Sequence, residues 1–186
     1  MTTPKPLRAD AQRNRDALLA TARELFADGR FDLRFDDFAR LAGVGTGTLY
    51  RHFPTRAALA EAVYREELTA LCDRGRTLLA TLPAVEALAE FLRGLVDHLH
   101  RHQGLARTLA TLMTAQPDTL AEGGRELEQV ITDLLGAGVE DGTVRDNVSA
   151  GAVLVVVQGI CAACGHPASR DDAEGAVTLV LDGLRP

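Results

Sequence analysis

Side chains that can bind phosphate oxygens and base edges are concentrated in one short stretch of the chain, residues 34–56. The stretch reads RFDDFARLAGVGTGTLYRHFPTR, and residues 46–52 carry two threonines, a tyrosine, an arginine and a histidine. Hydroxyl, imidazole and guanidinium groups are common donors to nucleic-acid phosphates and to base edges in a major groove. The residue types therefore suggest contact with a nucleic acid, if one exposed surface presents them together.

Two short helices joined by a tight turn would provide such a surface. The apolar residues of 35–42 recur at three- and four-residue spacings, so they share one helix face, which we expect to be buried. Gly43 and Gly45 allow the sharp reversal that sets a second helix across the first. In that second helix Leu49 and Phe53 lie one turn apart and can anchor it, which leaves the polar residues facing outward. This pattern predicts a helix-turn-helix.

The run GVGTGTLYRHFPTR, residues 43–56, resembles the DNA-binding signature of TetR-type transcriptional regulators. In that signature a Gly-Thr-Leu-Tyr-x-His-Phe core is followed by a basic residue that opens the fourth helix. The resemblance is close over roughly residues 11–65, and the rest of the chain is similar in length and helix pattern only. Two positions depart from the family pattern: Gly45 stands where a serine cap is frequent, and Arg34 stands where serine or threonine often opens the second helix.

The resemblance implies a DNA-binding transcriptional regulator that is not an enzyme and that acts as a repressor. Its partners would be a double-stranded, pseudo-palindromic DNA operator, a second copy of the chain in a homodimer, and a small-molecule effector whose identity the sequence does not give. By motif position, the candidate phosphate contacts are Thr48, Tyr50, His52, Arg56 and Arg34, and the candidate base-edge contacts are Thr46, Gly47 and Arg51.

The expected fold class is all-α, with about nine helices. A three-helix head would be joined by a long helix to a helical ligand-binding and dimerisation body. We expect a disordered basic arm at residues 1–10, a helix-turn-helix DNA-binding domain at 11–55 and a regulatory domain at 56–186. Apolar spacing predicts helices at about 11–28, 35–42, 46–53, 56–80, from 84 onward, 105–115, around 127–135, 150–164 and 171–184, with a loop at 138–147 and a Ser149 cap.

Charge is distributed unevenly along the 186 residues, whose formal net charge is −6. Residues 1–65 hold 11 basic and 8 acidic residues, a net +3, whereas residues 66–186 hold 9 and 18, a net −9. Such an asymmetry fits a DNA-reading head on an acidic body, although solvated helical surfaces also produce it. The first residues lack the apolar core of a signal peptide, and the apolar run 150–164 is shorter than the roughly twenty residues of a membrane span. We therefore expect a cytoplasmic protein without a membrane partner.

The apolar run 150–164 must be covered on all sides if it forms a helix. The last predicted helix offers a stripe of Val177, Val180, Leu181 and Leu184 along one side. These two helices could cover each other and leave one apolar face over. In proteins that this chain resembles, the final two helices pair with those of a second subunit as a four-helix bundle. We expect the leftover face to serve a homodimer in the same way.

A ligand pocket in the body would have mainly aliphatic walls. Of the eight Phe and Tyr residues, seven lie at or before Tyr64, and Phe91 is the single one beyond it. An aliphatic or flexible ligand is therefore a more natural guess than a flat aromatic one. The candidate lining residues are Phe91, Leu95, His98, His102, Met113 and Val130.

Cysteines and histidines in the body raise the possibilities of thiol redox chemistry and of metal binding. Cys161 and Cys164, near His166, could be core residues, a redox pair or half a metal site, but no second ligand pair stands at zinc spacing. His98 and His102 share a helix face, yet no HExxH-type glutamate accompanies them. We expect neither a metal nor a cofactor. The alternative function is a thiol-responsive or constitutive DNA-binding regulator without a small-molecule inducer.

Overall fold

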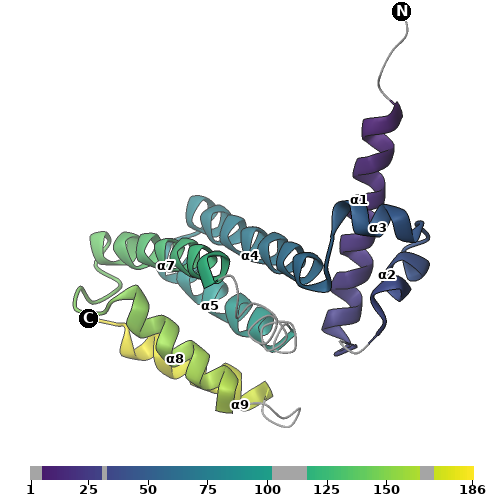
Figure 1. The fold of residues 1–186 in the computed structure, drawn as a ribbon. Helices are drawn as coiled ribbons and strands as arrows, with labels where there is room; N and C mark the ends of the chain where they lie inside the picture. Colours follow the sequence, from purple (N-terminus) through teal and green to yellow (C-terminus); the bar gives the residue numbers. More distant parts are fainter. Residues whose placement is uncertain (1–5, 31–32, 102–116, 164–169) are drawn as a thin grey trace, which may run out of the picture. The chain divides into compact units, whose positions relative to one another are not determined.

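The computed structural model describes residues 6–30, 33–101, 117–163 and 170–186, and in these ranges every regular element is an α-helix (Figure 1). The helices are α1 (Pro6–Ala27), α2 (Phe35–Leu41), α3 (Thr46–His52), α4 (Arg56–Thr81), α5 (Ala84–Arg101), α7 (Pro117–Glu140), α8 (Ala150–Ala163) and α9 (Arg170–Gly183). The predicted all-α fold class is confirmed, and the helix predicted at 105–115 lies outside the described residues. Among the helices described, none combines the length and hydropathy needed to cross a bilayer.

The described residues form two compact units. The N-terminal unit contains the described residues up to Glu66 together with Pro117, and the C-terminal unit contains the described residues of 67–101 and 118–186. Helix α4 contributes its first part, Arg56–Glu66, to the N-terminal unit and its remainder to the C-terminal unit. The division into domains at residue 55 that the sequence suggested stays a prediction.

The N-terminal unit is built on a small core in which α1, α2 and α3 contact one another (Figure 1). Phe26 of α1 and Phe38 of α2 are 1% and 0% exposed, and their ring centroids lie 5.6 Å apart. Leu49 of α3 is also completely buried. Burying aromatic and aliphatic side chains of this size contributes roughly 1.5–3 kcal/mol each. The apolar faces predicted for α2 and α3 are thus the faces that pack inward.

Helix α1 begins five residues earlier than the sequence suggested. It starts at Pro6, so residues 6–10 of the predicted disordered arm are helical, while residues 1–5 of that arm lie outside the described residues. Proline is well suited to the first turn of a helix, because its fixed φ is helical and its missing N–H has no intrahelical acceptor there. The end of the helix was predicted correctly: Gly29 follows it with φ 71°.

The C-terminal unit is centred on α5, which contacts α8 and α9 while α8 and α9 contact each other. Gly75, in the second half of α4, permits side chains of α5 and α7 to approach the backbone of α4 closely. A Cβ atom built there would lie 2.5 Å from Cγ1 of Val130 in α7 and 2.8 Å from the ring of Phe91 in α5. No side chain larger than hydrogen fits at this point without displacing its neighbours.

Helix α7 is longer than its sequence pattern suggested. The sequence predicted a helix around residues 127–135 and a loop at 138–147; in the structure α7 runs from Pro117 to Glu140, so Gly138 lies inside it. A Cβ on Gly138 would meet Val144 at 2.4 Å, so this glycine is needed where the following chain folds back, and it does not end the helix. The predicted cap of α8 is confirmed, since the hydroxyl of Ser149 accepts the backbone N–H of Ala152 at 3.2 Å.

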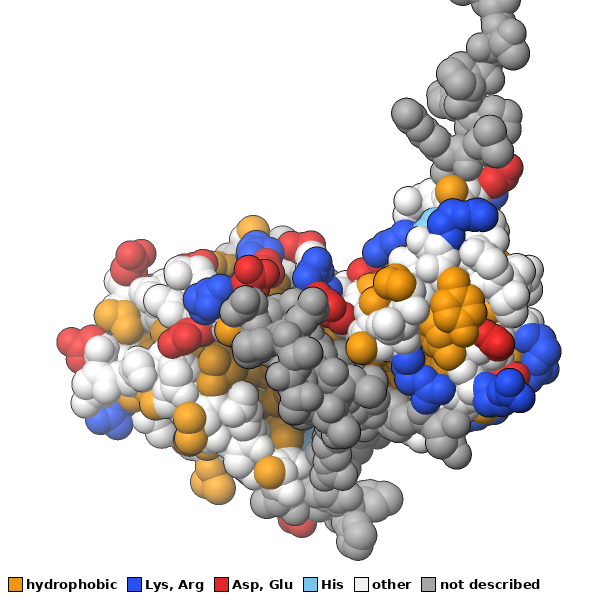
Figure 2. Space-filling view, viewed as in Figure 1, with side chains coloured by type: hydrophobic (Ala, Val, Ile, Leu, Met, Phe, Trp, Pro, Cys, Tyr) orange, Lys and Arg blue, Asp and Glu red, His pale blue; other side chains and the backbone are white. Residues whose placement is uncertain are grey.

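The apolar stripe of α9 is used within the protomer. Val177 and Leu184 are 2% and 4% exposed, so these two residues are covered within the protomer and are not part of a face left over for a partner. The large apolar residues that are exposed on α8 and α9 are instead Val155 (69%), Val156 (47%) and Leu179 (74%). Figure 2 shows apolar side chains on the surface in the region of α8.

Candidate nucleic-acid interface

Helix α3 is held from behind by two apolar anchors. Leu49 is 0% and Phe53 4% exposed, and the N–H of Phe53 donates to the Leu49 carbonyl at 2.7 Å. The helix opens at Gly45, whose backbone is extended (φ −69°, ψ 146°) and which offers no side-chain cap. Its carbonyl instead accepts the N–H groups of Thr48 at 2.9 Å and Leu49 at 3.1 Å. The first turn is therefore closed by backbone bonds alone.

The anchors turn the polar face of α3 outward. Thr46, Gly47, Tyr50 and Arg51 are exposed, and Thr48 and His52 are half-buried. Arg34 is exposed at the N-terminal end of α2, where it makes no side-chain capping bond. On the surface of the N-terminal unit, Lys and Arg side chains surround an apolar area (Figure 2). The predicted base-edge candidates on α3 thus lie on one accessible helix face.

Gly47 lies in the first turn of α3 with free space around its Cα. A Cβ built there has no protein atom within 4 Å, apart from the helix's own backbone. Packing within the protein therefore does not demand a glycine at this position. The position is the one on α3 where the backbone itself can come closest to a bound molecule.

Tyr50 is partly held in place by residues of α2. Its ring meets Phe35 edge-on, with centroids 5.3 Å apart and planes at 85°. A hydrogen bond to the carboxylate of Asp36 raises the pKa of Tyr50, so the phenol is neutral and acts as the donor. To donate to a phosphate it must exchange Asp36 for the phosphate oxygen. The sequence did not predict this role for Asp36, because an acidic residue in a first helical turn is already explained by the helix dipole.

Arg56 opens α4 next to this surface. It is half-buried, and the Cζ of its guanidinium lies 5.9 Å from the centroid of the Phe38 ring. The side-chain hydroxyl of Thr55 caps the helix by accepting the N–H of Ala58 at 3.1 Å. A guanidinium can place its face on an aromatic ring and also donate its edge N–H groups to the oxygens of an anion such as phosphate.

The ligand candidates in the C-terminal unit are buried where they are described. Phe91 and Leu95 are 0%, Val130 is 2% and His98 is 7% exposed. Phe91 and Val130 meet at Gly75, whereas the remaining two candidates, His102 and Met113, lie outside the described residues. The assignment of these residues to a ligand pocket stays a prediction.

A half-open groove of about 390 Å³ lies between α5 and α9. The described residues that line it are Arg93, Val96, Asp97, His100, Ala173, Glu174 and Val177. None of the predicted ligand candidates is among them. The charged residues of both signs at its rim are largely exposed, so water competes for every polar contact that a ligand would make there.

The described cysteines occupy buried positions. Cys161 is 5% exposed and its Sγ lies 4.0 Å from the carbonyl oxygen of Val96. Cys72 is fully buried, and burial, with a further contribution from Glu126, raises its pKa to about 11. A thiol with this pKa is protonated and unreactive near neutral pH. Cys164 and His166, which completed the predicted Cys and His cluster, lie outside the described residues, and within those residues no three potential metal ligands cluster.

A polar helix set across a buried one by a glycine turn defines a helix-turn-helix DNA-binding protein. Residues 18–63 match the family described as bacterial regulatory proteins, tetR family. Residues 83–186, more than half of the chain, match the C-terminal domain of SbtR-like transcriptional regulators. The chain belongs to the TetR family of transcriptional regulators, as its signature suggested.

Relatives extend this similarity over most of the chain. The HTH-type transcriptional repressor KstR2 of Mycolicibacterium smegmatis is 32% identical over 143 residues, which is 72% of this chain and 69% of that protein. The crystal structure of a TetR transcriptional regulator from Streptomyces coelicolor is 38% identical, covers 92% of this chain and 98% of its own, and has a TM-score of 0.79. A TetR regulatory protein from Mycobacterium vanbaalenii is 34% identical with a TM-score of 0.77, and covers 97% of this chain and 100% of its own.

Proposed function

We propose that this protein is a ligand-responsive transcriptional repressor that binds a pseudo-palindromic operator as a homodimer. The observation that supports DNA binding most strongly is the exposed polar face of α3, which Leu49 and Phe53 hold from behind. Repression is supported by the relative from M. smegmatis, which is named as a transcriptional repressor. Since operators lie in the bacterial cytoplasm, we propose that the protein works there.

The DNA contacts follow from position and chemistry. Arg51 is exposed on α3 and carries the guanidinium that suits a bidentate bond to guanine, and Thr46 and Gly47 lie at the helix end that enters the groove first. The residues proposed to bind phosphates, and so to set position without reading sequence, are Arg34, Thr48, Tyr50, His52 and Arg56.

The dimer is proposed to form through α8 and α9. Val155, Val156 and Leu179 present their apolar side chains to solvent on these two helices. A self-complementary contact of this kind gives two-fold symmetry, which presents two copies of α3 to half-sites about one DNA turn apart or more.

The effector is proposed to bind within the C-terminal unit and to weaken operator binding. The described candidates Phe91, Leu95 and Val130 are apolar and buried, which favours an aliphatic or flexible molecule, and His98 could supply one polar contact. Such coupling is reciprocal, so the operator must weaken effector binding by the same factor. The high pKa of Cys72 and the burial of Cys161 support this proposal over thiol sensing by these two residues.

A salt series on a selected operator tests the DNA-binding proposal. A duplex would first be selected from a random library by the parent protein, and its affinity then measured at several salt concentrations. Arg56→Ala should lower the salt slope by about one and keep the preferred sequence, because it removes one phosphate contact. Arg51→Ala should cost about 1–3 kcal/mol at one base position of each half-site.

Arg65→Ala is the matched control, since it removes the same charge from an exposed residue whose ion-pair partner, Glu61, lies on the same helix. It should leave both the salt slope and the sequence preference close to those of the parent. The proposal is wrong if the parent enriches no sequence at low salt, or if all three variants bind as the parent does.

A further inference from the structure

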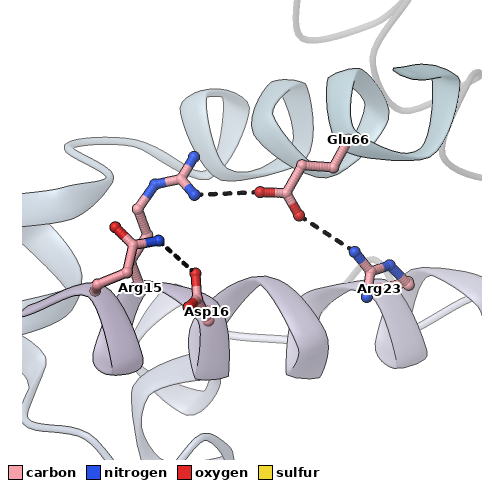
Figure 3. Close-up of polar contacts among 5 residues, drawn as sticks. Arg15, Asp16, Arg23 and Glu66 are labelled. Carbon is pink, nitrogen blue, oxygen red and sulfur yellow. Dashed lines mark hydrogen bonds and ion pairs between the residues drawn. The ribbon is translucent and has the colours of Figure 1, made fainter. Parts of the chain in front are cut away.

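A carboxylate of α4 bridges two arginines of α1 in the N-terminal unit. One oxygen of Glu66 accepts from Arg15 at 3.1 Å and the other accepts from Arg23 at 3.2 Å (Figure 3). The two arginines are eight residues apart, about two helical turns, so the single carboxylate spans a considerable length of α1. The sequence assigns no role to any of these residues, because their separation along the chain hides the contact.

Arg15 makes a second contact that leads to the recognition helix. Its Cζ atom lies 5.7 Å from the centroid of the Phe53 ring. Phe53 is the residue that ends α3, and its N–H is bonded to the carbonyl of Leu49 at 2.7 Å. Glu66, Arg15 and Phe53 therefore form a continuous connection from α4, through α1, to the end of α3.

Arginine is suited to both contacts at once. Its guanidinium is planar, so its face can lie on an aromatic ring while an edge N–H donates to a carboxylate. An ammonium group would keep the charge but would lose this combination of face and edge. The arrangement thus depends on the shape of the Arg15 side chain as well as on its charge.

We propose that Arg15 and Glu66 are positioning residues that hold α3 in the orientation in which it binds DNA. The inference rests on the proposed DNA-binding function and adds two residues that touch no DNA. Glu66 is also the last described residue of the N-terminal unit before α4 enters the C-terminal unit. The contact therefore lies where a change in α4 would first reach the helices that read the operator.

The proposal makes a prediction opposite in sign to that of simple electrostatics. Replacing Glu66 by Gln removes a negative charge, which by itself strengthens binding to polyanionic DNA. If the carboxylate positions α3 through Arg15, Glu66→Gln binds more weakly, because a smaller fraction of the protein has α3 correctly placed. The Arg15, Arg23 and Glu66 side chains are 36%, 40% and 38% exposed, so solvent screens the pairs and we expect a loss of about three- to tenfold.

Asp16→Asn is the charge-matched control. Asp16 is exposed on α1 next to Arg15, and it accepts a hydrogen bond from Gln12 of the same helix at 2.7 Å (Figure 3). This variant changes the net charge by the same amount as Glu66→Gln without touching α4. It should bind the operator as tightly as the parent or slightly more tightly.

The measurement is fluorescence anisotropy with a duplex that the parent protein has selected from a random library, over a salt series. Glu66→Gln and Arg15→Gln should both weaken binding, and the double variant should bind no more weakly than the weaker single variant, because both changes remove one connection. The salt slope of Arg15→Gln should equal that of the parent. A slope lower by about one would make Arg15 a phosphate contact and overturn the proposal.

Thermal unfolding separates positioning from folding. If Glu66→Gln proves unfolded, Arg15→Lys takes its place: it keeps the charge and should still weaken binding, whereas parent-like affinity overturns the proposal. Glu66→Gln binding as tightly as Asp16→Asn overturns it as well. In both cases the parent still selects and binds its duplex, so the proposed DNA-binding function survives. A parent that selects no duplex refutes both proposals together.

Discussion

At the level of the single residue, Gly47 is a glycine in a helix, where glycine lowers the stability of the folded protein. Glycine inside a helix costs roughly 0.5–1 kcal/mol relative to alanine, because it loses more backbone freedom on folding. No neighbouring protein atom requires this cost, since a Cβ at residue 47 would have open space around it. Under the proposed function the cost has a purpose: it lets the backbone of α3 approach the DNA.

Gly47→Ala should therefore make the protein more stable and the complex with DNA weaker. We expect the free energy of unfolding to rise by about 0.5–1 kcal/mol and the operator affinity to fall. Gly136→Ala, at an exposed α7 position that also has open space, should give a similar gain in stability and leave affinity unchanged. Denaturant unfolding and anisotropy measure the two quantities, and unchanged affinity in Gly47→Ala would remove the reason given for the glycine.

Tyr50, a proposed phosphate contact, is a neutral hydrogen-bond donor in the free protein, where it donates to Asp36. Its hydrogen bond to Asp36 raises the pKa above the ordinary value of 10.0, so the phenol remains a neutral donor at the pH of a binding experiment. The contribution of this bond to stability is fully present below the pKa of the unfolded state and is lost as pH rises through the higher pKa of the folded state. Near neutral pH the Tyr50 donor is therefore insensitive to small changes in pH.

At the level of elements, the turn between α2 and α3 depends on one left-handed residue. Gly43 has φ +68°, its N–H donates to Arg40, and the N–H of the next residue, Val44, donates back to Ala39 at 2.9 Å. This pair of bonds closes the end of α2 and sends the chain into α3. Gly45, two residues later, has an ordinary extended backbone.

Gly43→Ala should destabilise the N-terminal unit by about 1–2 kcal/mol, which is the cost of a left-handed conformation with a Cβ. Gly45→Ala is the comparison, because φ at Gly45 is −69° and the nearest atom to an added Cβ is Thr48 Oγ1 at 3.9 Å. It should cost less than Gly43→Ala, at most about 1 kcal/mol, which is the preference of an N-cap position for glycine over alanine. Chemical denaturation of both variants distinguishes them, and equal stabilities would contradict this account of the turn.

The short helices of the N-terminal unit could be predicted from sequence because local signals agree there. The spacing of Phe35 and Phe38, the turn glycine Gly43 and the anchor Leu49 all indicate the same two helices, and the structure has them at Phe35–Leu41 and Thr46–His52. What sequence could not show were contacts between distant residues, such as that of Glu66 with Arg15. Ion pairs of this kind leave no periodic pattern.

Burial in the C-terminal unit shows a second limit of sequence patterns. An apolar stripe predicts that a helix face is covered, but it does not tell whether the covering element belongs to the same chain or to a partner. Val177 and Leu184 belong to the apolar stripe seen in the sequence, and the structure shows that both are buried within the protomer. Gly138 looked like the start of a loop, yet it lies inside α7 because Val144 of the returning chain packs against it.

At the level of the whole molecule, charge is unevenly divided between the two parts of the sequence. The net +3 of residues 1–65 suits a polyanion, and the net −9 of residues 66–186 keeps the remainder from binding DNA indiscriminately. The exposed apolar residues of α8 and α9 belong to the acidic part. Under the proposed function, the acidic part carries the dimer contact and the basic part carries the DNA contact.

Leu179→Glu, or Val155→Glu, should convert the proposed dimer into a monomer, because a charge at the centre of an apolar interface is left without water or a partner. Val139→Glu is the control, since Val139 is an exposed apolar residue of α7 (37%), outside the two helices proposed to pair. Sedimentation velocity at micromolar concentration measures the oligomeric state. A monomeric parent would rule out the dimer, and dimeric Leu179→Glu and Val155→Glu variants would place it elsewhere.

The rate at which the buried thiol of Cys72 is alkylated can report how often the C-terminal unit opens. Alkylating reagents react with the thiolate, and a fully buried thiol with a pKa of about 11 offers almost none of it at neutral pH. Labelling at this position must await a transient opening of the C-terminal unit, so its rate reports the free energy of that opening. A compound that binds the closed unit slows the reaction in proportion to its occupancy. Peptide-level labelling of Cys72 can thus reveal an effector before any operator is known.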